Sequence, residues 1–203
     1  SGMVDYTIGG EIAPALISDY SQIIDLMADN TYRHRTVFLE RDVAVSPAYM
    51  AKDLTNIRKI VGNTHSFVIE NYGGYLNSDN FGLFNSVPNN ALISSLGIKF
   101  DTITLMVNTN ANIGVLAGTN YGTIFNVSIG ALPSIDTGYM GTVAAQKKTV
   151  ATFSNDVHNR YLSSVIDSQE IATLLVRFTT GDGSVGGMFG SSQGLITNSF
   201  VSI

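Results

Sequence analysis

Apolar and polar positions recur along this chain in a unit that begins with glycine. Two apolar residues and a small residue follow, then a polar stretch, then a β-branched residue with Ser, Thr or Asn two positions later. The copies start at Gly82, Gly114, Gly141 and Gly187, and the one at Gly141 is degenerate. Such a repeat predicts stacked short strands, because one unit cannot bury its own apolar face whereas neighbouring units bury each other's.

Stacking places equivalent residues of successive units in columns. The repeat predicts which residues each column contains. One internal column is expected to hold Ile93, Ile124, Val150 and Ile196. A second holds Leu83, Val115, Thr142 and Met188. On the opposite side of the same strands we expect Phe84, Leu116, Val143 and Phe189.

Two residue types in the unit have a structural explanation. The leading glycine suits a turn that needs positive φ or a close approach of backbones. The small polar residues that follow the β-branched position are expected to hydrogen-bond along one corner of the stack. They are Ser95, Asn126, Thr152 and Asn198. We therefore assign both types to the scaffold.

One helix is expected ahead of the repeats. Its apolar stripe, at helical spacing, consists of Tyr20, Ile23, Ile24 and Met27. Ser18 is the expected N-cap, Asp19 suits the positive N-terminus, and Asp29 and Asn30 end the helix. A helix of about three turns is stable only when docked. We expect it to cap the open end of the stack.

The remaining patterns divide the chain into a leader with the capping helix, residues 1–35, and the stack, residues 36–203. Residues 4–17 are expected to be extended, and a helical turn is expected within 48–54. Residues 71–74 are predicted to be a turn and 157–168 a loop. Strand patterns lie at 36–39, 42–45, 65–70, 98–105, 128–132 and 171–179.

Composition narrows the possible functions. Charged residues make up only 13% of the 203, the net charge is −5 and the pI is near 5.0, which argues against a nucleic-acid partner. The absence of cysteine excludes disulfides and thiolate metal sites. No segment has the roughly 18 apolar residues of a membrane span. The start, Ser1-Gly2-Met3, is typical of residues left by cloning before an internal fragment.

Each motif that could carry chemistry lacks part of the pattern that this chemistry requires. His34, His65 and His158 lack metal-ligand spacing, and Gly181–Gly186 matches G-x-G-x-x-G without a following helix. Asn108–Asn112 lacks the glycine and glutamate of a calcium loop. We therefore predict no catalytic residue, cofactor or metal. The carboxylates that loop stacking might bring together are Asp101, Asp136, Asp156, Asp167 and Asp182. The tyrosines that might contact a ligand are Tyr72, Tyr75, Tyr121 and Tyr139.

The glycine units resemble a known repeat. Gly82-Leu83-Phe84, Gly114-Val115-Leu116-Ala117-Gly118 and Gly187-Met188-Phe189-Gly190 are similar to the Gly-Leu-any-Gly (GLUG) repeat of large secreted or surface-attached bacterial proteins. The strands at 37–43 and 63–69 also resemble those that accompany it. The resemblance covers about 36–129 and 185–203. It implies an all-β, right-handed parallel β-helix and no particular ligand.

The leading functional hypothesis is a non-enzymatic segment of a bacterial adhesin, extracellular or on the cell surface. We expect a monomeric fragment of a longer chain that attaches to a protein or glycan of a host or neighbouring cell. The loops expected to make that contact are 47–62, 106–112, 131–139 and 155–169. Two alternatives stay open: a glycan-active β-helix such as a lyase, hydrolase or tailspike-like enzyme, and a spacer domain of a secreted protease or toxin.

Overall fold

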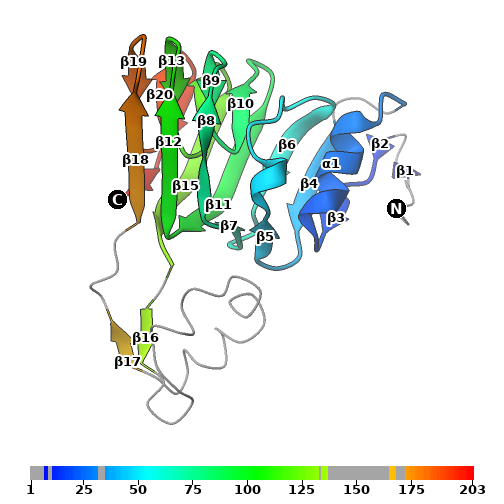
Figure 1. The fold of residues 1–203 in the computed structure, drawn as a ribbon. Coiled ribbons are helices and arrows are strands. Elements are labelled where there is room, and N and C mark those ends of the chain that lie inside the picture. Colours follow the sequence, from blue (N-terminus) through cyan, green and yellow to red (C-terminus); the bar gives the residue numbers. More distant parts are fainter. Residues whose placement is uncertain (1–6, 9–10, 32–34, 133, 137–164, 168–171) are drawn as a thin grey trace.

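The computed structural model describes residues 7–8, 11–31, 35–132, 134–136, 165–167 and 172–203 (Figure 1). This part of the chain is mostly β, and its larger sheets are parallel. Two short pairs are antiparallel, β1 (Thr7–Ile8) with β2 (Glu11–Ile12) and β16 (Ser134–Asp136) with β17 (Val165–Asp167). The all-β class predicted from the repeats is therefore confirmed.

The parallel strands recur in a fixed order, and we call each pass through that order a rung. Before the first complete rung come β3 (Ala15–Ile17), the helix α1 (Tyr20–Ala28), β4 (Arg35–Leu39), β5 (Val43–Val45) and the 3₁₀ turn η1 (Pro47–Tyr49). Rung one contains β6 (Ile57–Val61), β7 (Ser66–Ile69), β8 (Tyr72–Leu76), β9 (Asn80–Phe81) and β10 (Phe84–Val87). Rung two contains β11 (Leu92–Phe100), β12 (Thr102–Val107), β13 (Ala111–Ile113) and β14 (Ala117–Asn120).

Rung three contains β15 (Thr123–Ala131), β18 (Thr173–Phe178), β19 (Gly183–Val185) and β20 (Phe189–Ser192). A further, partial rung holds β21 (Leu195–Thr197) and β22 (Phe200–Val201). Each strand pairs in parallel with its counterpart one rung later. This produces the three-stranded sheets β8-β12-β18, β9-β13-β19 and β10-β14-β20, and a larger sheet that includes β3, β4, β6, β11, β15 and β21.

An excursion from the stack separates β15 from β18. Tyr72 pairs with Ile103, 31 residues later, whereas Ile103 pairs with Leu174, 71 residues later. A single residue, Asp101, connects β11 to β12, but residues 132–172 connect β15 to β18. The long gap in the repeat therefore corresponds to an excursion that contains β16 and β17.

The predicted Ile column is correct except for Val150. Ile93 pairs with Ile124, and Ile124 pairs directly with Ile196, so no rung containing Val150 lies between them. Ile60 extends the column at its other end. The degenerate copy at Gly141, with Thr142, Val143, Val150 and Thr152, lies outside the described residues.

The glycine motif forms a corner between two strands. Leu83 N–H donates to Val115 O (2.9 Å) and Leu116 N–H to Met188 O (3.0 Å), so the three copies are adjacent. Two details of the prediction are wrong. Phe84 pairs with Ala117 rather than Leu116. Leu83 and Phe84 are both fully buried rather than on opposite faces, because the chain bends between β9 and β10.

The third copy also starts one residue earlier than predicted. Val185 pairs with Ile113, and Phe81 pairs with Ile113 on the other side. The glycine that follows each paired residue is Gly82, Gly114 or Gly186. Gly187 therefore occupies the next position along the corner. Because Gly186 and Gly187 are adjacent, the sequence pattern could start at either one, and the prediction took the second.

The helix closes one end of the stack, as expected. Tyr20, Ile23 and Met27 of the predicted stripe are buried, while Ile24 is only partly buried and Leu26 takes a core position. Tyr20 packs its ring against Phe67 of β7, with the ring centroids 5.4 Å apart. Figure 1 shows α1 beside β3 and β4 at the N-terminal end.

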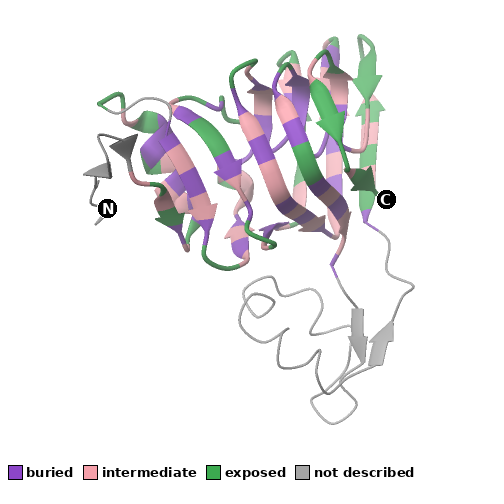
Figure 2. Ribbon diagram, turned by 180° about the vertical axis from the view of Figure 1, so that it is seen from behind, coloured by how far each residue is buried: buried purple, intermediate pink, exposed green. Residues whose placement is uncertain are grey.

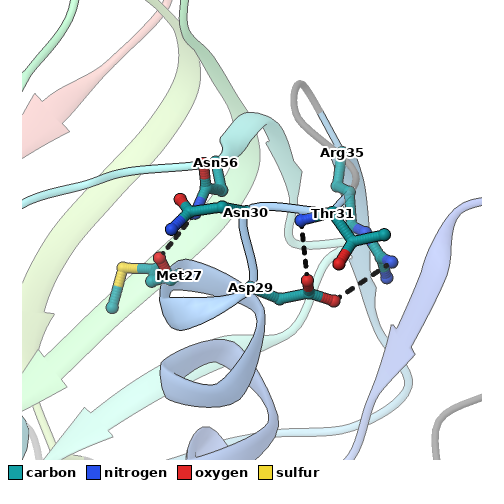
Figure 3. Close-up of polar contacts among 6 residues, drawn as sticks. All are labelled: Met27, Asp29, Asn30, Thr31, Arg35 and Asn56. Atoms are coloured by element: carbon teal, nitrogen blue, oxygen red, sulfur yellow. Dashed lines mark hydrogen bonds and ion pairs between the residues drawn. The ribbon is translucent and has the colours of Figure 1, made fainter.

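The last turn of the helix is bonded to the loop before β6 (Figure 3). Asn56 Nδ2 donates to Met27 O (2.8 Å) and to Asn30 Oδ1 (3.0 Å). Asp29 accepts from Thr31 N–H at 2.9 Å and lies 3.7 Å from an Arg35 guanidinium nitrogen. The hydrogen bonds from Thr31, followed by the charge of Arg35, lower the pKa of the Asp29 carboxyl. These contacts fix the cap where the first strands begin.

Asp19, not Ser18, is the N-cap. Its carboxylate accepts from Ser21 N–H (2.8 Å), and Gln22 accepts from Asp19 N–H (3.0 Å), which completes a capping box. Ser18 N–H instead donates to Gln22 Oε1 (2.8 Å). The helix ends at Ala28 with Asp29 as C-cap, as the sequence predicted.

Replacing Asp19 with alanine is expected to lower the free energy of unfolding by about 1 kcal/mol, because it removes the cap. The hydrogen bonds from Ser21 lower the pKa of the Asp19 carboxyl. A carboxyl with a lowered folded-state pKa stabilises the protein above its unfolded-state pKa and loses that effect as pH falls through the folded value. Urea melts of Asp19→Ala and wild type should therefore converge at acidic pH. A gap that stays constant down to low pH would contradict this.

Several strand boundaries differ from the sequence expectations. Residues 71–74 were predicted to be a turn but mostly belong to β8, and 98–105 is divided at Asp101 between β11 and β12. The expected loop 47–62 includes β6, and 106–112 includes the end of β12 and the start of β13. The loop expected over 157–168 overlaps β17. Within the extended leader expected over 4–17, the described residues form β1, β2 and β3. The strands expected at 36–39, 42–45, 65–70, 128–132 and 171–179 are found as β4, β5, β7, β15 and β18.

Candidate functional site

A row of exposed polar turns follows one edge of the stack. The turns enter β9, β13 and β19 and project from the same side of the molecule (Figure 1). We call this row the polar turn edge and define it as residues 77–80, 108–110 and 179–182. Most of its residues are exposed. It contains the middle of the loop 106–112 that the sequence singled out, together with the equivalents in the rungs on either side.

Hydrogen bonds between rungs hold these turns in register. Thr180 Oγ1 donates to Asn108 O (2.7 Å), and Asp182 N–H donates to Asn110 Oδ1 (2.8 Å). On the other side, Asn112 N–H donates to Asp79 O (2.8 Å). Gly181 has a φ of 77°, which glycine adopts without a steric cost. The turns therefore present a preorganised surface.

Two carboxylates remain available on this edge. Among the described residues, neither Asp79 nor Asp182 has a protein partner for its side chain, although the backbone of each is bonded to a neighbouring rung. Both lie in turns at the solvent surface. Exposed carboxylates accept hydrogen bonds from hydroxyl or amide donors, such as those of a glycan or a peptide.

Asp101, another of the predicted carboxylates, lies away from this edge. Asp101 precedes β12, whereas Asp182 follows β18, which pairs with β12 along its length. A six-residue strand separates the two ends by roughly 20 Å. The pair thus lacks the spacing of roughly 5–9 Å that glycoside hydrolysis requires. Asp136 and Asp167 lie on the β16–β17 pair, and Asp156 is outside the described residues.

The remaining candidate residues, the histidines, the tyrosines and the glycine motif, are not gathered into one site among the described residues. His65 Nδ1 lies 3.8 Å from Asp42 Oδ1, and that oxygen also accepts from Ser66 N–H (2.8 Å). His34, His158 and Tyr139 lie outside the described residues. Tyr72 packs on Phe81, while Tyr75 is 81% exposed and Tyr121 45%. Gly181–Gly186 leads through β19 into a corner, and no helix follows it among the described residues.

Three of the four residues expected in the polar corner column are at equivalent positions, and the fourth, Thr152, lies outside the described residues. Ser95, Asn126 and Asn198 share a positive φ of 53°, 55° and 46°. Asn198 Nδ2 donates to Asn126 Oδ1 (3.4 Å). Asn tolerates this backbone region better than most residues. The corner is therefore scaffold, as predicted, and it bends each rung within one strand.

Replacing Asn126 with alanine is expected to lower the free energy of unfolding by about 1 kcal/mol, because alanine is strained at positive φ. Asn126→Gly removes the same side chain and relieves that strain, so it should be closer to wild type. Thermal melts of the two variants test this. An Asn126→Gly protein as unstable as Asn126→Ala would show that the side-chain contact, rather than φ, matters.

A buried amide went unnoticed in the sequence. Asn120 is fully buried, accepts from Gly122 N–H (3.0 Å) and donates to Ser192 Oγ (3.1 Å). Beside it, Thr119 Oγ1 donates to Asn80 Oδ1 (2.9 Å). The counterparts of Asn120 in the neighbouring rungs are Val87 and Ser192, so the position shows no consistent residue type.

Comparisons with protein-family models, curated proteins and solved structures found no match. Within the described residues, no three His, Asp or Glu side chains are grouped as metal binding would require. In the same part of the chain, no helix has the length and apolar character needed to cross a membrane.

Proposed function

We propose that this chain is a right-handed parallel β-helix segment of a bacterial surface or secreted adhesin, and that the polar turn edge contacts the partner. The observation that carries the proposal is the hydrogen bonding that holds the polar turns side by side: Asp79 O accepts from Asn112 N–H, and Asp182 N–H donates to Asn110 Oδ1. A right-handed path is the one that crossover connections between parallel strands take in nearly all proteins.

The stack supplies rigidity and the turns supply recognition. Core residues of successive rungs, such as Ile93 and Ile124, are fully buried and pair directly, so the strands form a continuous support. Turns held on such a support lose little conformational entropy when they bind. Glycans present O–H donors and peptide backbones present N–H donors. The carboxylates of Asp79 and Asp182 can accept hydrogen bonds from both. The resemblance to the GLUG repeat supports an extracellular or cell-surface location.

The test is attachment of the purified chain, immobilised on beads, to a glycan array and to cultured host cells. The double variant Asp79→Asn/Asp182→Asn keeps the turn hydrogen bonds, which use the backbones of both residues, and removes both charges. We expect its retention to fall at least tenfold. Asp101→Asn, at the opposite end of the β8-β12-β18 sheet, is the matched control and should bind like wild type.

Three results would contradict the proposal. Equal retention of the double variant and wild type would exclude the polar turn edge as the contact. Absence of binding by wild type to every glycan and cell type would favour the spacer alternative. Release of sugar products from a polysaccharide by the wild-type chain would instead favour the glycan-active alternative.

A further inference from the structure

The sheet β8-β12-β18 has an outer face that leads directly to the polar turn edge. The three strands lie side by side and end at the turns that enter β9, β13 and β19 (Figure 1). Strand pairing aligns Tyr75 with Met106 and Met106 with Arg177, so these three residues form a row across the rungs. Side chains alternate between the two faces of a strand. The row therefore lies on the side opposite the buried residues Leu76 and Val107, next to the turns.

Tyr75 is the most prominent residue on this face. Its side chain is 81% exposed, the largest exposed fraction among the large hydrophobic residues of the described chain, and Figure 2 shows by contrast how much of the stack is buried. Within the same part of the chain, no hydrogen bond or ring contact engages this side chain. Two positions earlier on the same face, a Cβ at Gly73 would meet no atom within 4 Å. The Tyr75 ring thus has free space beside it along the strand.

The surroundings of Tyr75 are polar but uncharged. Neither β8 nor β12 contains a charged residue. Gly73 pairs with Thr104, so a hydroxyl lies beside the free space. Because β12 pairs on both sides, its backbone groups are engaged within the sheet, and a ligand on this face meets side chains. The nearest carboxylate along β8 is Asp79, which follows Tyr75 by four residues, at most about 14 Å of chain.

A neutral glycan matches this combination of groups. A sugar ring presents C–H bonds on one side and hydroxyls around its rim. The face of an aromatic ring is apolar and carries partial negative charge, so it attracts the C–H side. A carboxylate accepts hydrogen bonds from the hydroxyls. The separation of the ring from the carboxylate suits an oligosaccharide rather than a single sugar.

Other classes of ligand match the face less well. A nucleic acid needs cations for its phosphates, but β8 and β12 contain no Lys or Arg and the chain carries a net charge of −5. A peptide binds through its backbone at a sheet edge or through its side chains in pockets. The outer face of paired strands, with a glycine beside an exposed ring, offers neither.

We propose that the outer face of β8 and β12 is a sugar platform, made up of Gly73, Tyr75, Thr104 and Met106. A neutral oligosaccharide stacks one ring on Tyr75 and donates hydroxyl hydrogen bonds to Asp79. This inference rests on the proposed adhesive function and names its ligand class. The sugar platform lies on the side of the stack, so a further strand beside β8 or β18 would extend the sheet and leave the platform uncovered.

Tyr75→Ala tests the stacking on the glycan array. The side chain is mostly in solvent, so the melting temperature should stay within about 2 °C of wild type. Retention on neutral oligosaccharides should fall at least tenfold. Tyr75→Phe keeps the ring and should bind like wild type. Tyr121→Ala is the matched control and should also bind like wild type, because Tyr121 is 45% exposed but lies between β14 and β15, outside the sugar platform.

Periodate treatment of the host cells tests the ligand class, because periodate cleaves the vicinal diols of sugars and leaves peptide bonds intact. Retention of the wild-type chain should be lost after treatment. Retention that survives treatment, retention confined to acidic glycans, or a Tyr75→Ala protein that binds like wild type would each overturn the inference. If Asp79→Asn/Asp182→Asn still lost binding in those cases, the adhesive function would stand without the sugar platform. No retention of wild type on any surface would overturn both.

Discussion

The variant Gly114→Ala is expected to be strongly destabilised. A Cβ at Gly114 would lie 2.5 Å from Phe189 Cα and closer still to the carbonyl oxygens of Ala117 and Met188. All three are backbone atoms of the corner and of the next rung, so no side-chain rotation relieves the overlap. Steric insertion into packed surroundings typically costs about 1–3 kcal/mol. An overlap with three backbone atoms should reach the upper limit of about 3 kcal/mol, which for a domain of this size lowers Tm by about 6–12 °C.

Gly73→Ala is the matched control for that prediction. Gly73 lies in β8 on the outer face of its sheet, and an added Cβ there meets nothing within 4 Å. Its melting temperature should stay within about 2 °C of wild type, since surface substitutions usually change stability by less than about 0.5 kcal/mol. If Gly114→Ala and Gly73→Ala melted together, the close approach of rungs at the corner would be wrong.

The second large effect is expected at Phe67, which joins the helix cap to the stack. Phe67 is fully buried, and its ring meets Tyr20 edge to face. Phe67→Ala removes the ring from both layers and should lower the free energy of unfolding by about 3–5 kcal/mol. Burial without a hydrogen-bond partner raises the pKa of the neighbouring Tyr20 hydroxyl, which shows how apolar this junction is.

Urea unfolding followed by circular dichroism measures the effect, and Phe125→Ala supplies the comparison. Phe125 lies in the same sheet but is 47% exposed, so its truncation should cost less than about 1 kcal/mol. Equal losses for the two variants would contradict the placement of Phe67 at the centre of the core. Loss of the helix signal alone in Phe67→Ala would show that the cap unfolds independently.

The corners and the Ile column could be predicted from the sequence because both recur in the repeat. The sequence offered two explanations for the leading glycine, a positive φ or a close approach of two backbones. The structure shows a close approach at the corner glycines, because a Cβ at Gly82 would meet Ala117 backbone atoms. Ile93 and Ile124 fall at the same place in successive rungs because they are separated by one undisturbed period. The polar corner at Asn126 and Asn198 was readable for the same reason.

The sequence pattern predicted the wrong strand register where the excursion interrupts the repeat. The copy at Gly141 satisfies the pattern locally, and the spacing alone placed Val150 between Ile124 and Ile196. Strand pairing is a tertiary property, and here it joins residues 72 positions apart. A short glycine pattern carries no information about which strands become neighbours, so local similarity could not reveal this.

The missed strand β8 has a similar explanation. Asn71, Gly73 and Gly74 are turn-forming residues, yet β8 pairs with β12 along its length. Gly74 leaves room for the Tyr72 ring, which would lie 3.2–3.4 Å from an added Cβ. Packing against the neighbouring rung thus overrides the local preference. The polar turn edge was found only at 106–112, because its equivalents at 77–80 and 179–182 share no common sequence pattern.

The whole stack depends on β12 and β18 being neighbours despite the excursion between them. The natural chain has no cysteine, so a pair can be introduced at Thr104 and Leu175, which face each other on the outer side of that sheet. Paired strands lie about 4.8 Å apart, within the Cα separation of roughly 4.4–6.8 Å that a disulfide requires.

Mass spectrometry after mild oxidation and thiol alkylation gives the result. We predict a nearly complete intramolecular disulfide in Thr104→Cys/Leu175→Cys and none in Gly73→Cys/Leu175→Cys, whose positions are two rungs apart at about 10 Å. Free thiols in the first variant, with the chain folded, would mean that another strand separates β12 from β18. That result would contradict the register on which the whole stack depends.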